Sequence, residues 1–137
     1  MMFSSQRRRP RRGAAAVEAA VVFPILLSFF AATYQLGRLG KIADSVSTAA
    51  RNGAQYGSIN SMTAAKTSNI RAAAVTEMAG LPNVSSTNPT VTPTTVTHSG
   101  TNFIRVQVTY DMTGTSIFPM FGVNSLSRTV EMPMMPQ

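Results

Sequence analysis

Reactive side chains are scarce in this chain of 137 residues, which has no cysteine, no tryptophan and a single histidine, His98. Without cysteine, neither a disulfide framework nor a thiolate metal site can form. The carboxylates beyond the N-terminal region do not have the spacing of metal ligands; they are Asp44, Glu77, Asp111 and Glu131. Nucleotide-binding and hydrolase motifs are also missing. The sequence therefore predicts no enzyme, no cofactor and no metal site.

Charge is also scarce, and it is unevenly placed. Only 12% of the residues are charged, and the formal net charge is +7. Basic residues cluster within the first twelve positions: Arg7, Arg8, Arg9, Arg11 and Arg12. A basic tail suits nucleic acid or anionic lipid. An apolar run lies directly beside this tail, so we expect it to set membrane topology and expect no nucleic-acid partner.

The apolar run contains a single charged residue, Glu18, between positions 14 and 32. Its length approaches the ~20 residues that cross the hydrocarbon of a bilayer as a helix. The positive-inside rule then predicts a cytoplasmic basic leader at 1–13, a transmembrane helix at 14–36 in membrane lipid, and an extracytoplasmic domain at 37–137. A secretory signal peptide is the alternative, but its apolar region is shorter and rarely contains a glutamate. Pro24 is tolerated within a membrane helix.

The helix is predicted to continue to about residue 57. Residues of small and medium size recur there at helical spacing: Leu39, Ile42, Val46, Ala49, Gly53 and Tyr56. We expect this seam to pack on the protein's own outer domain, with another chain as the alternative partner. Gly53 and Gly57 form a G-x-x-x-G pair, which is a weak association signal outside lipid.

A second helix is predicted at about 61–79, capped by Asn60 or Ser61 and ended by Gly80 and Pro82. Its buried side is expected to hold Ile70, Ala73, Ala74, Val75 and Met78. The segment 82–101 is rich in serine, threonine and proline. It is either a partly ordered loop or a strand that Pro93 restricts to the edge of a sheet.

Strands are predicted within about 103–132. Apolar and polar residues alternate from Phe103 to Tyr110, as in a half-buried antiparallel strand. Residues 99–102 are expected to form a turn, 117–121 an apolar loop, and 126–132 a further strand. The fold class is thus α+β, in which a long N-terminal helix precedes a short helix and a small antiparallel sheet.

The stretch Gly13-Ala14-Ala15-Ala16-Val17-Glu18 resembles the leader junction of type IV pilins and pseudopilins, with Glu at the fifth position after the glycine. RRGAAAVEAAVVFPILL is similar to the opening of the TadE-like family, pseudopilin-type proteins of tight-adherence (Flp-type) pilus systems. The later stretches AARNGAQYG, IFPMFG and SLSRTVEMP resemble that family too. The resemblance implies a pilin-like fold.

The resemblance also implies roles for particular residues. Gly13 would precede the cut of a prepilin peptidase, Ala14 would become the new N-terminus, and Glu18 would pair with the N-terminal amine of a neighbouring subunit. Further partners would be other pilins or pseudopilins and the Tad platform membrane proteins, in the bacterial inner membrane. Ala19 stands where major Flp-type pilins carry tyrosine, which favours a minor pseudopilin or an assembly factor over the main filament subunit.

Function is therefore expected in the assembly of a tight-adherence pilus or a related secretion apparatus, without catalysis. The alternative is an uncleaved single-pass membrane protein, whose small extracytoplasmic domain binds a partner or ligand.

Overall fold

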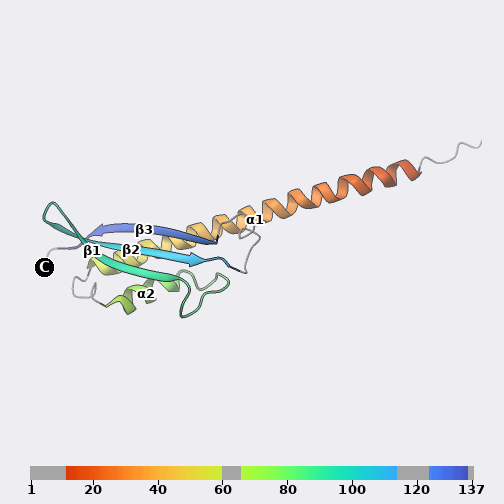
Figure 1. The fold of residues 1–137 in the computed structure, drawn as a ribbon. Helices are drawn as coiled ribbons and strands as arrows, with labels where there is room; N and C mark the ends of the chain where they lie inside the picture. The colour runs from red at the N-terminus through yellow and green to blue at the C-terminus, as the bar shows by residue number, and fades with distance from the viewer. Residues whose placement is uncertain (1–11, 60–65, 114–123, 136–137) are drawn as a thin grey trace, which may run out of the picture. The chain divides into compact units, whose positions relative to one another are not determined.

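The computed structural model describes residues 12–59, 66–113 and 124–135. The elements follow the order α1 (Arg12–Ile59), α2 (Thr67–Thr76), β1 (Thr90–His98), β2 (Thr101–Asp111) and β3 (Ser125–Pro133) (Figure 1). The predicted α+β class, with a long helix, a short helix and an antiparallel sheet, is confirmed. The chain divides into two compact units, residues 1–36 and 37–137, which are described separately below.

The sheet of the second unit has the antiparallel order β1-β2-β3, so β1 is an edge strand. Pro93 lies within β1, where the missing backbone N–H is tolerated because none of the described strands pairs on that side. His98 pairs with Thr101, and the two residues between them turn with positive φ, 50° at Ser99 and 82° at Gly100. Two-residue hairpins favour this geometry. Residues 90–98 therefore form a strand, and the predicted turn is confirmed.

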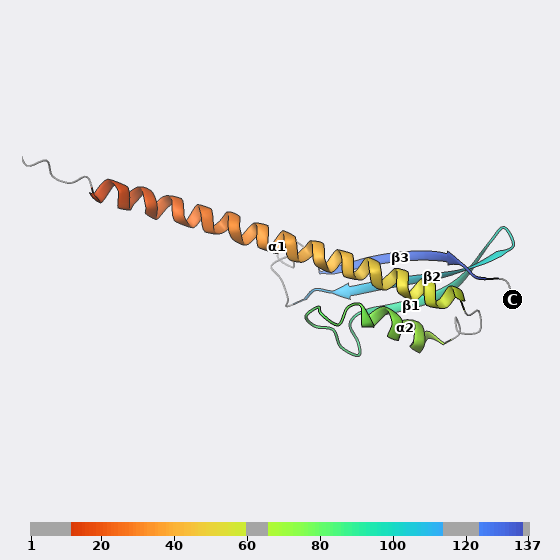
Figure 2. The same cartoon turned by 180° about the vertical axis from the view of Figure 1, so that it is seen from behind.

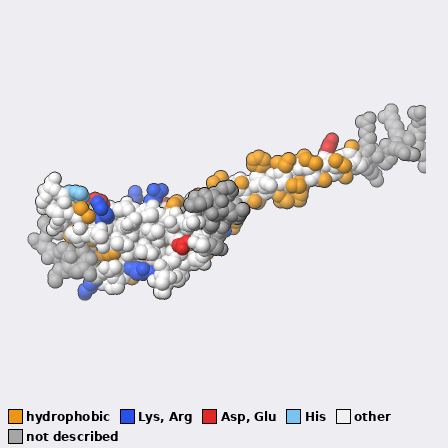
Figure 3. Space-filling model, in the orientation of Figure 1, with side chains coloured by type: hydrophobic (Ala, Val, Ile, Leu, Met, Phe, Trp, Pro, Cys, Tyr) orange, Lys and Arg blue, Asp and Glu red, His pale blue; other side chains and the backbone are white. Residues whose placement is uncertain are grey.

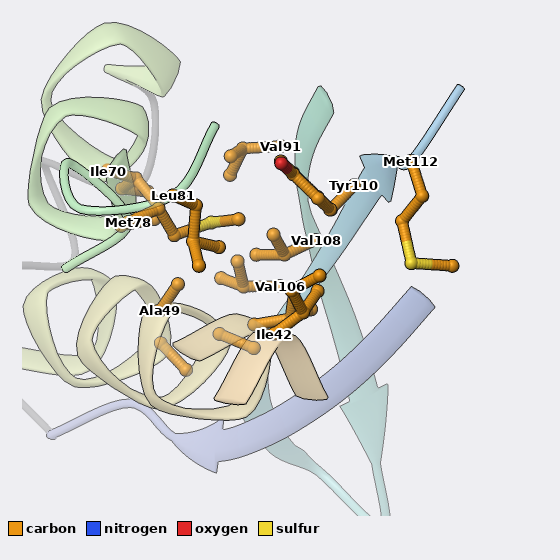
Figure 4. Close-up of a cluster of buried hydrophobic side chains, with 14 of the residues drawn as sticks. Ile42, Ala49, Ile70, Met78, Leu81, Val91, Val106, Val108, Tyr110 and Met112 are labelled. Carbon is orange, nitrogen blue, oxygen red and sulfur yellow. The ribbon is translucent and has the colours of Figure 1, made fainter. Parts of the chain in front are cut away.

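The core of the second unit lies between the sheet and the helices, which cover the same face of the sheet in both views (Figures 1 and 2). The alternation predicted for β2 is confirmed, since Ile104, Val106, Val108 and Tyr110 are all buried. Residues from α2 and the connecting segments complete this cluster (Figure 4). Among the described residues of β1, Val91 is the only one that is buried. The sheet and both helices thus share one core.

The second half of α1 supplies the other wall of this core. The buried side chains are Ile42, Val46, Ala49, Ala50 and Ala54. The predicted seam is confirmed except at Tyr56, which is 38% exposed. A 3-4-3-4-3 spacing advances by less than the 3.6 residues of a straight helical turn, so the seam rotates off the sheet-facing side. The buried positions consequently move to Ala54, Gly57 and Ser58.

Gly53 and Gly57 allow α1 to lie close to the central strand. A Cβ atom built at Gly57 would lie 2.9 Å from Cγ1 of Ile104, and one at Gly53 would lie 3.2 Å from Cγ1 of Val106. The G-x-x-x-G pair therefore serves a contact between helix and sheet within the second unit. This is the use that the expected intramolecular packing of the seam requires.

The second helix is shorter than predicted. It covers Thr67–Thr76, and Lys66 at its N-cap makes no side-chain capping bond. The predicted caps, Asn60 and Ser61, lie outside the described residues. Ile70, Ala74 and Met78 are buried as expected, whereas Ala73 and Val75 are half-buried.

The prediction that Gly80 ends the second helix as a C′ glycine was wrong. Gly80 does not have the positive φ of a C′ glycine; the first described residue with positive φ is Asn83, at 59°. Residues 77–80 form turns after the helix, and the chain adopts the left-handed conformation only beyond Pro82. Asparagine tolerates this region because its short polar side chain bonds locally. The other strand prediction, at 126–132, is confirmed by β3, while the apolar segment 117–121 lies outside the described residues.

Candidate functional site: the apolar half of the first helix

The described residues of the first unit form a helix whose side chains are exposed from residue 13 to residue 34. Large apolar groups dominate this surface, and Phe29 and Phe30 are 70% and 79% exposed. Figure 3 shows the apolar side chains along the helix. By length and composition the helix is able to cross a membrane. Apolar area of this extent is unfavourable in water, so it requires lipid or other helices as its surroundings.

Two hydroxyl groups within this stretch are bonded to the backbone of the helix itself. The Ser28 hydroxyl donates to the carbonyl of Pro24 over 2.8 Å, and the Thr33 hydroxyl donates to the carbonyl of Phe29 over 2.9 Å. Hydrocarbon offers no hydrogen-bonding partners, so such internal bonds are what an apolar environment requires. The helix continues through Pro24. Both hydroxyls are therefore compatible with burial in lipid.

Apolar side chains also shape a shallow depression on this half of the helix. It has a volume of about 410 Å³ and is lined by Leu26, Phe29, Phe30, Thr33 and Tyr34. Ridges and grooves of this kind are the features through which helices pack against one another. Such a surface is able to pack against another helix as well as against lipid.

Glu18 is the only charged side chain between residues 13 and 37. It is exposed, and it forms no ion pair with any residue in the described ranges. Ala14 lies four residues earlier, so the two positions share one side of the helix. Gly13 is in the first turn of α1, and no side chain or backbone atom would contact a Cβ atom placed there. The carboxylate and the predicted cleavage point thus lie one helical turn apart.

The basic leader falls mainly outside the described residues. Of its five arginines, Arg7, Arg8, Arg9 and Arg11 precede the described part of the chain, and Arg12 is the first residue of α1. The topology expected from this leader stays a prediction.

Three ionisable groups of the second unit, His98, Arg105 and Glu131, lie together on its surface. Nε of Arg105 donates to Oε1 of Glu131 over 2.6 Å, and Nε2 of His98 lies 3.6 Å from Oε2 of the same glutamate. His98 therefore lies at an exposed strand end beside a carboxylate. Within the described ranges, no three His, Asp or Glu residues are grouped to hold a metal ion.

Two groups near the end of β2 have shifted pKa values. Burial raises the pKa of the Tyr110 phenol, and the positive charge of Arg38 only partly opposes this shift. The phenol donates its hydrogen bond to the carbonyl of Pro82. Hydrogen bonds from the side chain and backbone of Thr113 lower the pKa of Asp111. Both groups thus tie connecting segments to the sheet.

Comparison with known proteins supports the resemblance over part of the chain. Residues 13–55 match the model of a family described as TadE-like protein. No curated protein and no solved structure matches the chain. The matched stretch begins at Gly13, includes Glu18 and ends between Gly53 and Gly57, so it covers the exposed apolar helix and most of the segment that packs on the sheet.

Proposed function

We propose that the chain is a TadE-like pseudopilin or minor pilin that takes part, without catalysis, in assembling a tight-adherence pilus or a related secretion apparatus. The supporting observation is the exposed apolar surface at 13–34, which lies within the TadE-like match and carries Glu18 as its only charge. Residues 14–36 would anchor the protein in the bacterial inner membrane. The basic leader at 1–13 would remain in the cytoplasm, and the domain at 37–137 would lie outside it.

The proposed topology is open to a direct labelling test, because the chain has no cysteine of its own. Thr95 is exposed on β1, so a Thr95→Cys variant presents one thiol on the outer domain. We expect a membrane-impermeant maleimide to label this thiol in intact spheroplasts. Labelling only after the membrane is permeabilised would reverse the proposed orientation.

Cleavage between Gly13 and Ala14 is the second element of the proposal. A prepilin peptidase would remove residues 1–13 and leave a free amine on Ala14. Intact-mass measurement of the protein extracted from its native membrane should show the loss of those residues. A mature protein that keeps its first thirteen residues would exclude the peptidase and leave the uncleaved anchor.

Glu18 would then pair with the free amine of a neighbouring pilin or pseudopilin. An unpaired ionised carboxylate at the centre of a membrane helix costs roughly 2.5–3.5 kcal/mol on insertion scales. Glu18 lies about one turn inside the proposed span, where the cost is smaller but still unfavourable. Opposite charges attract strongly in a low dielectric, and a subunit out of register would leave both charges without a partner. The charge thus favours a single axial register between helices. The Tad platform membrane proteins would bind the same apolar surface.

The test of this pairing is Glu18→Gln, which removes the charge and keeps the shape. We expect pilus assembly to fail while the outer domain remains folded. Thr33→Val is the matched control, since it removes a polar group from the same helix without changing charge, and assembly should persist. Normal piliation in Glu18→Gln would contradict the role of the charge.

An uncleaved, membrane-anchored binding module is the second candidate. It is favoured by one observation: residues 37–137 form a compact unit with a hydrophobic core of their own. This function predicts that the fragment 37–137, supplied without the apolar helix, restores activity to cells that lack the protein. The pseudopilin function predicts that it does not.

A further inference from the structure

Two basic residues, Arg38 and Lys41, follow the exposed apolar stretch of α1. Both belong to the second unit, at 37–137, and they are three positions apart, so they lie about one turn from each other on the surface of the helix. No acidic residue lies between Glu18 and Asp44 in the sequence. This segment of the helix therefore carries positive charge that no acidic residue of the same segment offsets.

The fold does not neutralise these two charges. In the described ranges, neither side chain forms an ion pair. Lys41 is exposed, and Arg38 is half-buried. The charge of Arg38 acts on the phenol of Tyr110, but burial raises the pKa of that phenol, so it stays neutral and does not offset the charge. Both cations are thus left for a partner outside the described part of the chain.

Basic residues at this end of a membrane helix require an explanation. The positive-inside rule predicts that Lys and Arg gather on the cytoplasmic side, where the leader supplies five arginines. The proposed orientation puts Arg38 and Lys41 on the opposite side of the membrane. They are fewer than the leader arginines and do not reverse the orientation, so their charge serves neither topology nor the fold.

The distance along the helix brings both residues to the level of the lipid headgroups. A helix rises ~1.5 Å per residue, so residues 14–34 span about 30 Å, which is the thickness of the hydrocarbon core. Arg38 and Lys41 follow at about 6 and 10 Å beyond that core, and each headgroup region is about 5–8 Å thick. Helical side chains tilt toward the N-terminus, which directs both long side chains back toward the membrane.

We propose that Arg38 and Lys41 bind the phosphate groups of anionic phospholipids and thereby fix the depth of α1 in the membrane. This inference rests on the proposed function, because it requires that residues 14–36 span the bilayer. Ammonium and guanidinium groups donate charge-assisted hydrogen bonds to phosphate oxygens. An anionic membrane surface attracts each nearby Lys or Arg by about fivefold in affinity.

Charge favours lipid over a second copy of this chain as the partner. A copy inserted to the same depth would present its own Arg38 and Lys41 at this level, and like charges repel each other. Its first acidic residue on this side of the membrane, Asp44, lies about one helical turn further from the membrane than Lys41. Anionic headgroups supply the missing negative charge at the level of the cations themselves.

The sequence allows a test that ignores the leader. The chain contains two lysines, Lys41 and Lys66, and neither lies in the leader. The full chain, labelled with ¹⁵N at lysine Nζ, is placed in vesicles of digalactosyldiacylglycerol, a neutral lipid without phosphorus. Phosphatidylglycerol is then added, and solid-state NMR measures the dephasing of each Nζ signal by ³¹P. We expect dephasing at Lys41, as a direct hydrogen bond to phosphate requires, and none at Lys66, which is exposed at the start of α2.

The lipid class is tested by replacing phosphatidylglycerol with phosphatidylcholine or with inorganic phosphate, which should both dephase Lys41 less. Arg38→Gln should raise the fraction of phosphatidylglycerol needed for half-maximal dephasing by about fivefold, since one of two attracting charges is lost. Arg51→Gln is the matched control. It removes an exposed cation about 20 Å further along α1, beyond the range of unscreened attraction, and should leave that fraction unchanged.

A thiol in the middle of the helix separates this inference from the proposed function. Phe30→Cys in the same vesicles should resist a membrane-impermeant maleimide if the helix spans the bilayer. With that thiol protected, the inference alone is overturned if Lys41 is not dephased, if Lys66 is dephased equally, if inorganic phosphate acts as well as the lipid, or if Arg51→Gln acts like Arg38→Gln. A labelled thiol would overturn the span itself, and the lipid contact with it.

Discussion

Gly57→Ala tests the close contact between α1 and β2. The added Cβ would lie 2.9 Å from Cγ1 of Ile104, a distance that real Cβ contacts essentially never show. Ile104 is only 1% exposed, so its side chain has no open space into which to move. Gly40 is the matched control, since it lies in the same helix and a Cβ there has no neighbour within 4 Å.

Two opposing terms set the size of the effect. Inserting a methyl group into a packed core typically costs 1–3 kcal/mol. Replacing glycine by alanine within a helix contributes about 1 kcal/mol of stabilisation. Gly57→Ala should therefore lower the free energy of unfolding of the outer domain by about 0–2 kcal/mol, whereas Gly40→Ala should raise it by roughly 0.5–1 kcal/mol. The difference between the variants isolates the steric term, about 1–3 kcal/mol.

Hydrogen exchange of the β2 amides measures this difference in the full chain, because β2 is the central strand and its amides exchange when the outer domain unfolds. A difference of 1–3 kcal/mol corresponds to protection about 5- to 150-fold lower in Gly57→Ala than in Gly40→Ala. Equal protection in the two variants, or higher protection in Gly57→Ala, would refute the view that glycine is required there for close packing.

Two further predictions concern the ends of the sheet. Tyr110→Phe removes the hydrogen bond to the carbonyl of Pro82 and should lower the free energy of unfolding by about 0.5–1.5 kcal/mol. Because burial raises the pKa of Tyr110, the unfolded chain releases the phenol proton first, so stability is full below about pH 10 and falls as pH rises through the folded pKa. Denaturant titrations at alkaline pH should show this fall in the native chain and less of it in Tyr110→Phe. Thr113→Val removes the hydroxyl bond that lowers the pKa of Asp111. An NMR titration should then show the pKa of Asp111 rising toward its ordinary value. A lowered carboxyl pKa stabilises the folded state above the unfolded pKa, and this stabilisation is lost as pH falls. The stability of the variant should therefore be less sensitive to acid. An unchanged pKa would mean that the hydroxyl is not the partner that matters.

Periodicity was enough to predict most of the fold. The alternation in β2 and the helical spacing of the seam are direct consequences of one buried face, and both appear in the sequence. The predicted seam was wrong at Tyr56 because its 3-4 spacing has nearly the 3.6-residue period of a straight helix. The two periods cannot be distinguished over a few turns, although they diverge over five. The predicted C-terminus of α2 was wrong for another reason. Gly80 and Asn83 both permit positive φ, and only the path of the connecting chain decides which residue adopts it.

The candidate site was predicted from two local features, an apolar run and a glutamate at fixed spacing from a glycine. Both lie within one helix, so no tertiary information was needed to place Ala14 and Glu18 one turn apart. The alignment of the strands could not be predicted in the same way. The cross-strand rows of the sheet join residues that are far apart in the sequence. Their alignment depends on the register between strands, which the hairpin turn and the buried face together determine.

The two halves of α1 differ in their surroundings, since the first is exposed and the second packs on the sheet. Mutations in the two halves should therefore have different effects. Large apolar side chains are exposed at 13–34, whereas small buried residues such as Ala50 and Gly53 line the sheet at 42–57. Small residues permit a close contact with the sheet, and large exposed ones offer area to lipid or to other helices. Changes in the first segment should therefore alter assembly while the domain at 37–137 keeps its stability, and changes in the second should lower the stability of that domain. If Glu18→Gln reduced the hydrogen-exchange protection of β2, this division would be wrong, because the charge would then contribute to the fold and not to a partner.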